Sequence, residues 1–100
     1  MVSQDAARQQ IELRLDRLRQ QAYSTLKDLP PFAIEEIPFG SETWSLTTYR
    51  DVEKDAVRIV AQIGPPQPKL LLIRVQADGF RMKQDGTITR LSENELFEFM

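Results

Sequence analysis

The chain of 100 residues contains no histidine and no cysteine. The first absence removes the side chain that titrates nearest to neutral pH, and the second removes the most reactive soft nucleophile. The usual ligand sets for zinc, copper, haem and iron–sulfur clusters are therefore missing as well. We expect a protein that binds no metal or other cofactor and is not an enzyme.

Long hydrophobic runs are also missing. The longest unbroken apolar run, Leu70 to Ile73, is far too short to span a membrane. The first residues, Met1 to Asp5, become polar at once and show no apolar segment typical of a secretory leader. We therefore expect a cytoplasmic protein with no membrane partner.

No charge of one sign dominates, because the net charge is −2. A dedicated nucleic-acid binder normally has a strong basic excess, so we do not expect nucleic acid as the main partner. The charges are nevertheless segregated: residues 28–55 carry a net −5 and residues 56–91 a net +4. Hydrophobic residues at 41% and charged residues at 28% are typical of a globular chain, and the length predicts one domain over residues 1–100.

The first 29 residues have the period of a helix. Apolar side chains recur every three or four positions from Ile11 to Leu29, with charged residues between them. Pro30 and Pro31 remove backbone donors and end the helix. The pattern predicts one long amphipathic helix over residues 1–29, about 39 Å long from Gln4 onward. Strands of eight residues span only about 26 Å, so we expect the start of the helix to overhang the sheet.

From residue 32 to residue 91 the period changes to two, which is typical of antiparallel strands. Alternation places Trp44 and Leu46 on the core side of a strand over residues 43–50. The pattern also predicts a short edge strand over residues 32–37 that ends at Pro38. Further strands are predicted over residues 56–63, 69–77 and 87–91, together with a strand that has Phe80 and Met82 inward. The pairs Asp78-Gly79 and Asp85-Gly86 predict hairpin turns at either end of that last strand.

A short helix is expected over residues 92–100, because Ser92 and Glu95 have the spacing of a capping box. Short loops between the strands make consecutive strands antiparallel neighbours. The predicted fold class is α+β: a long N-terminal amphipathic helix packed on a five- to six-stranded antiparallel meander, followed by a short C-terminal helix. The order of elements resembles the α+β layout of the cystatins, a helix followed by antiparallel strands.

The apolar seam of the predicted helix is the first candidate site. Ile11, Leu15 and Leu18 follow the spacing of a coiled coil, which favours self-association into a homodimer. The alternative is that the seam covers the protein's own sheet, because an antiparallel sheet needs one covered face.

The uncovered face of the sheet is the second candidate site. Alternation places several cations and one aromatic ring there, namely Arg58, Arg74, Arg81, Lys83 and Tyr49. Such a face is suited to an acidic protein segment or to single-stranded RNA, through charge and stacking. The alternative is an ordinary solvated face.

Paired carboxylates for acid–base catalysis are not evident. Glu35 and Glu36 are adjacent and face opposite sides of a strand, and residues 51–55 have the composition of a solvated acidic turn. We therefore predict a small non-catalytic interaction or assembly domain, whose partner is another protein or a second copy. Binding of an acidic partner or RNA on the sheet, and an enzyme based on carboxylate, lysine or tyrosine chemistry, are the alternatives.

Overall fold

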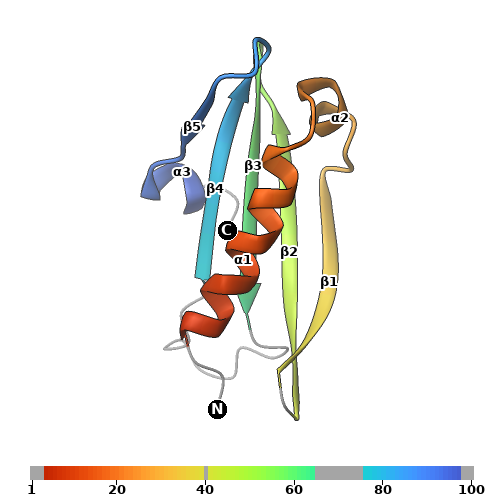
Figure 1. Cartoon of the computed structure of the whole chain (residues 1–100), viewed down its shortest axis with the longest axis vertical. Helices are drawn as coiled ribbons and strands as arrows, with labels where there is room; N and C mark the ends of the chain where they lie inside the picture. Colours follow the sequence, from red (N-terminus) through yellow and green to blue (C-terminus); the bar gives the residue numbers. More distant parts are fainter. Residues whose placement is uncertain (1–3, 40, 65–75, 98–100) are drawn as a thin grey trace.

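A computed structural model describes residues 4–39, 41–64 and 76–97 (Figure 1). The helices and strands in chain order are α1 Gln4–Arg19, α2 Tyr23–Lys27, β1 Phe32–Phe39, β2 Glu42–Val52, β3 Ala56–Gly64, β4 Gln76–Lys83, β5 Ile88–Arg90 and α3 Glu93–Phe97. The predicted α+β class is confirmed, with an N-terminal helix on an antiparallel sheet and a short C-terminal helix.

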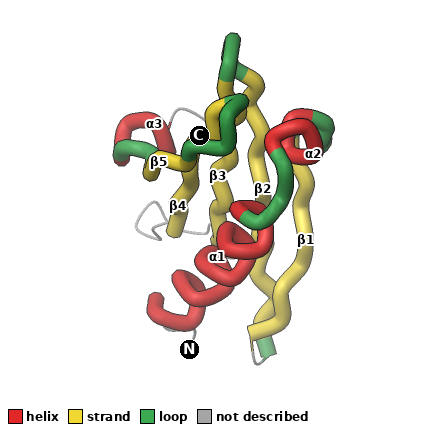
Figure 2. Tube along the Cα trace, turned by 45° about the horizontal axis from the view of Figure 1, so that its top comes forward, coloured by secondary structure: helices red, strands yellow, loops and turns green. Residues whose placement is uncertain are grey.

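The five described strands form one antiparallel meander in the order β1-β2-β3-β4-β5. Helix α1 crosses one face of the sheet and contacts mainly β3 and β4 (Figures 1 and 2). We call this side of the sheet the helix face and the other side the outer face. Strand β1 lies at one margin of the sheet, and the three-residue β5 lies at the other.

The hydrophobic core lies between α1 and the helix face. The predicted alternation of β3 is confirmed, since Val57, Ile59, Ala61 and Ile63 all belong to one buried cluster, which does not include Val60 although this residue is buried as well. They pack against side chains of α1 and against residues of the neighbouring strands. The other members of this core are Ala7, Ile11, Leu15, Leu26, Leu46, Phe80 and Met82. Trp44 packs against the core but stays partly exposed.

The single helix predicted over residues 1–29 is wrong, because the chain breaks after Arg19 and forms a second helix from Tyr23. Ala22 is extended, with φ −70° and ψ 154°, and the chain turns there. After this turn, α2 places the side chain of Leu26 in the core, where it is fully buried. The expected overhang is also wrong, since Ala7 near the start of α1 is buried.

The hairpin predicted at Asp78-Gly79 is wrong as well, because both residues lie inside β4. Gly79 pairs with Val60, and a Cβ atom at Gly79 would lie 2.3 Å from the carbonyl oxygen of Ile59 and 3.1 Å from Leu91 Cδ1. This glycine therefore permits close packing between strands rather than a turn. Most of the strand expected over residues 69–77 lies outside the described residues.

Two local predictions near the C-terminal end are confirmed. Gly86 has a φ of 94° in the turn between β4 and β5, where the Gly86 N–H donates to Lys83 O at 2.8 Å. At the start of α3, the Glu95 N–H donates to Ser92 Oγ and the Ser92 N–H donates to Glu95 Oε1, both at 3.3 Å. These reciprocal bonds form the capping box.

None of the helices in the described ranges is long and apolar enough to cross a membrane.

Candidate functional site

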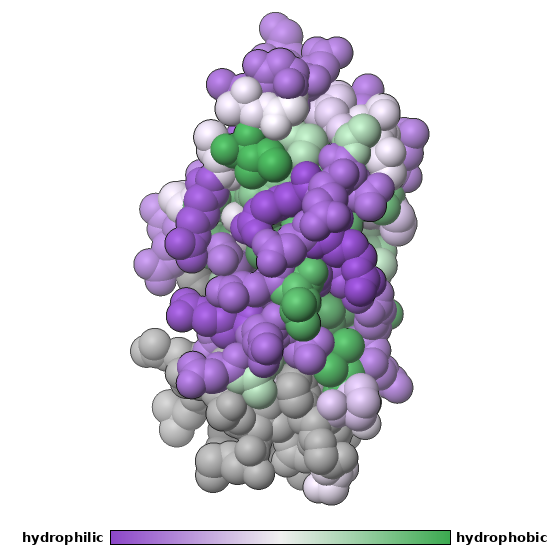
Figure 3. Space-filling model, viewed as in Figure 1, coloured by the Kyte–Doolittle hydropathy of each residue, from purple (hydrophilic) through white to green (hydrophobic). Residues whose placement is uncertain are grey.

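The predicted self-association seam lies inside the domain. Ile11 and Leu15 are 2% and 0% exposed, and Leu18 packs against the same core. Side chains that are buried beneath α1 cannot also contact a second chain while this fold is kept. The surface above them is mostly hydrophilic, with only small and separated hydrophobic areas (Figure 3). The structure therefore corresponds to the alternative in which the seam covers the protein's own sheet.

The second predicted site does lie on one face. Tyr49 is opposite Val60, Arg58 is opposite Arg81, and Lys83 continues the same side of β4. All these side chains belong to the outer face because residues of this parity alternate with the core residues of each strand. Arg74 lies outside the described residues.

The outer face is not an uncompensated basic surface, however. Arg58 Nη2 lies 2.6 Å from Asp51 Oδ2, and Arg81 Nε lies 2.6 Å from Glu53 Oε1. Arg81 also pairs with Glu95 of α3. The hydrogen bonds that Arg81 donates to Glu53 and to Glu95 raise the pKa of Arg81, and the bond donated to Glu95 lowers the pKa of that carboxyl group. Arg58 and Arg81 are thus already paired with carboxylates of this chain, and a bound polyanion would have to compete with those carboxylates.

Sequence reasoning missed these pairs because it treated residues 51–55 as a solvated turn. Asp51 and Glu53 instead lie beside the outer face and pair with Arg58 of β3 and Arg81 of β4. The segregation of charge could have indicated these pairs. In an antiparallel meander consecutive strands are neighbours, so the acidic residues 28–55 lie beside the basic residues that follow them.

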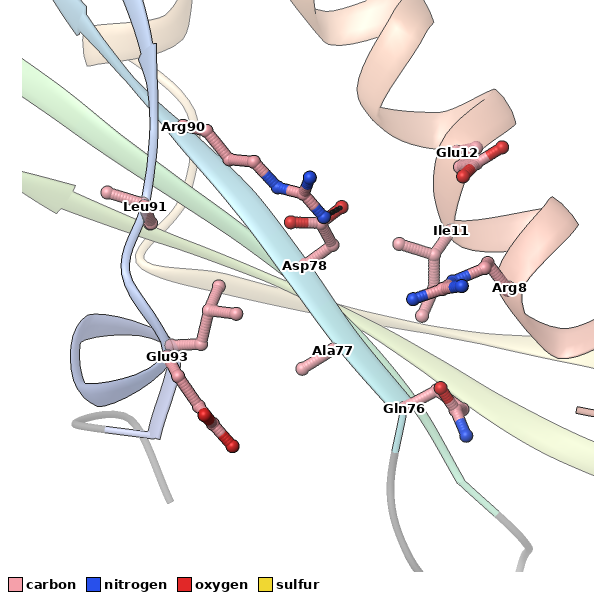
Figure 4. A pocket seen from close by; sticks show the side chains of 10 residues that line it. Arg8, Ile11, Glu12, Gln76, Ala77, Asp78, Arg90, Leu91 and Glu93 are labelled. Atoms are coloured by element: carbon pink, nitrogen blue, oxygen red, sulfur yellow. Dashed lines mark hydrogen bonds and ion pairs between the residues drawn. The ribbon is translucent and has the colours of Figure 1, made fainter.

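A hollow of about 390 Å³ lies between α1, β4 and α3 (Figure 4). Arg8 and Glu12 of α1 line this hollow together with Asp78 of β4, and Arg90 Nη2 lies 3.3 Å from Asp78 Oδ2. Charges of both signs compensate each other there, and the described lining contains no hydroxyl or amine side chain. In the described part of the chain, no three potential metal-ligating side chains gather at one place. The hollow indicates no particular reaction.

A different surface, at the margin of β1, was not singled out by the sequence. The Arg50 N–H donates to Pro31 O at 2.9 Å, so Pro31 and the alternate residues after it direct their backbone groups toward β2. The backbone groups of Phe32, Ile34 and Glu36 therefore point away from the sheet. Among the described elements, no helix or strand covers this margin (Figures 1 and 2). We call these outward groups, with the side chains of the same residues, the β1 edge.

The β1 edge also carries exposed hydrophobic side chains. Phe32 and Ile34 are 58% and 61% exposed and lie on the outer face. On the helix face of the same strand, Arg14 Nη1 donates to Glu35 Oε1 at 2.7 Å, and this bond lowers the pKa of Glu35. This bond connects β1 to α1 through the helix face of the strand. The expectation that Glu35 and Glu36 face opposite sides is consistent with this pairing.

The comparisons with known proteins give no relative: no family model matches the chain, and no curated protein or solved structure is significantly similar to it.

Proposed function

We propose that this chain is a non-catalytic interaction domain that binds an extended polypeptide along the β1 edge. The supporting observation is the combination of outward backbone groups and exposed side chains at Phe32 and Ile34. In strand addition, main-chain hydrogen bonds to a sheet edge provide affinity, and side chains at alternate positions provide specificity. The β1 edge has both components.

The length and composition of β1 support the proposal further. Monomeric proteins usually protect sheet margins with very short strands, charged side chains, prolines or bulges. The margin formed by β5 is protected by its length, since β5 has only three residues. Strand β1 has eight residues, and its glutamates and Pro38 all follow Ile34. The part before them, with Phe32 and Ile34 exposed, carries none of these protecting features.

The experiment is a selection of extended peptides from a displayed random library on the immobilised wild-type protein. Bound peptides should protect the amides of Phe32, Ile34 and Glu36 from hydrogen exchange. Ile34→Pro removes one outward donor without removing a bond to β2, and proline is tolerated at such positions. We expect it to weaken peptide binding at least about tenfold, or 1.4 kcal/mol.

Leu13→Glu is the matched control, because Leu13 is 57% exposed on α1 and lies outside the β1 edge. It should leave peptide binding unchanged. Peptides that protect amides elsewhere, or that bind Ile34→Pro as tightly as the wild type, would overturn the proposal.

A further inference from the structure

We infer that the segment bound at the β1 edge is β1 of a second copy of this chain, paired antiparallel with Ile34 opposite Ile34 of that copy. The inference rests on the proposed function and names its partner. The result is a homodimer in which the two sheets become one continuous sheet, and both α1 helices lie on the same side of it.

Prolines flank the β1 edge at equal distances from Ile34. Phe32, Ile34 and Glu36 supply the outward N–H groups, and the next residues of the same parity are Pro30 and Pro38, which have none. This segment is therefore symmetric about Ile34. When an identical strand is paired antiparallel about that residue, each proline faces a proline and every outward donor faces an outward acceptor.

The side chains that this register places opposite each other are compatible. Ile34 meets Ile34 of the other copy, so these two exposed apolar side chains cover each other on the outer face, while Phe32 lies opposite Glu36 and diagonal to Ile34. Glu35 meets Ala33 on the helix face, where Arg14 already pairs with Glu35. No like charges are directly opposite, an arrangement that would be destabilising.

Neighbouring registers are less favourable. Pairing about Glu35 places this carboxylate opposite its own copy and places Phe32 opposite Pro38. Pairing about Ala33 places Glu36 opposite Pro30, which has no N–H group. By symmetry, one hydrogen bond is therefore missing at each end of the paired segment. The register about Ile34 is therefore the one that satisfies both hydrogen bonding and charge.

The absence of cysteine from the chain makes the register testable by disulfide trapping. Directly opposite residues in a hydrogen-bonded antiparallel pair have Cα atoms about 5.5 Å apart, which a disulfide can span. Ile34→Cys should therefore form a covalent dimer under mild oxidation. Phe32→Cys alone and Glu36→Cys alone should form no covalent dimer, because the two like cysteines of such a dimer lie about 13 Å apart along the strands. A mixture of those two variants should form the mixed disulfide dimer.

Solution mass provides the second measurement. Light scattering from roughly 1 µM to 1 mM should show the wild type passing from monomer to dimer. Ile34→Pro should raise the dissociation constant about tenfold or more, whereas Leu13→Glu should not change it. Circular dichroism of each variant confirms that the domain is folded.

The outcomes separate the two proposals. A wild type that stays monomeric at 1 mM, and whose Ile34→Cys variant does not crosslink, overturns the homodimer; peptide binding at the β1 edge would then still support the proposed function. A crosslink between Phe32→Cys and Ile34→Cys, without one for Ile34→Cys alone, overturns the register. A dimer that survives Ile34→Pro and forms none of these disulfides overturns the inference, because its interface lies elsewhere.

Discussion

Arg58 of β3 and Arg81 of β4 lie directly opposite each other on the outer face, and each guanidinium has its own carboxylate. Like charges at opposite positions of two strands are destabilising when nothing compensates them. Asp51 and Glu53 provide that compensation from the end of β2 and the residue after it, so the charges connect three strands on a face that α1 does not cover.

Loss of one carboxylate should expose this repulsion. Glu53→Gln is expected to lower the free energy of unfolding by about 1 kcal/mol, because the pair with Arg81 is only partly exposed. Urea denaturation at low ionic strength measures the change. The double variant Glu53→Gln/Arg81→Gln should recover part of the loss, since it also removes one of the facing cations. Independent, additive effects of the two substitutions would show that the pairing does not contribute.

Gly79 should be intolerant of even one added carbon. Gly79→Ala is expected to lower the free energy of unfolding by about 1–3 kcal/mol, because the new Cβ would meet the carbonyl oxygen of Ile59, which belongs to the backbone. Gly86 is the comparison, since it has a positive φ but open space around it. Gly86→Asn should be milder than Gly86→Ala, because asparagine tolerates positive φ better, whereas Gly79→Asn should be as harmful as Gly79→Ala. Equal tolerance at both sites would contradict the packing found in β4.

Leu15 and Leu13 test the assignment of the helix seam to the core. Leu15→Ala should cost about 2–5 kcal/mol of unfolding free energy, because the side chain is fully buried. Leu13→Ala should change it by no more than about 0.5 kcal/mol. Thermal and urea denaturation at two protein concentrations provide the measurement. A loss for Leu15→Ala that disappears at high protein concentration would indicate an interface instead of a core.

Acid should destabilise the domain through its paired glutamates. The pKa of Glu35 and that of Glu95 are lowered, chiefly by the hydrogen bonds from Arg14 and Arg81 respectively. The unfolded chain therefore binds protons more readily than the folded domain. The stabilisation is fully present above the ordinary glutamate pKa of 4.5 and is lost as the pH falls through the folded-state values.

Denaturation at pH 7 and pH 3 measures this dependence. Glu35→Gln should lose less stability between the two pH values than the wild type does, because its side chain cannot be protonated. Glu12→Gln, at an exposed position of α1, serves as the control for loss of a carboxylate. If Glu35→Gln shows the full wild-type dependence, the ion pair with Arg14 does not contribute to acid stability.

The features that the sequence predicted correctly depend on neighbours in the chain. The alternation of Val57, Ile59, Ala61 and Ile63 follows from the two-residue repeat of a strand, and the seam through Ile11 and Leu15 follows from the helical period. The capping box and the turn at Gly86 need only a few consecutive residues. These patterns determined the fold class.

The incorrect predictions concern contacts between residues distant in sequence. Asp78-Gly79 has the composition of a turn, yet Gly79 is required by its proximity to Ile59 and Leu91. The break after Arg19 accompanies the burial of Leu26 in the core, where this side chain meets residues distant in sequence. The basic face acquired its counterions only when the strands paired.

The sequence alone determined that this chain is an α+β domain with one helix seam and alternating strands, because backbone geometry imposes those periods locally. Tertiary structure decided which surface is left uncovered. Pro38 by itself favours an edge position for this strand, because proline within sheets is confined mainly to edge strands. The exposure of Phe32 and Ile34 depends in addition on which described elements pack beside them, and this is decided only when the whole sheet has formed.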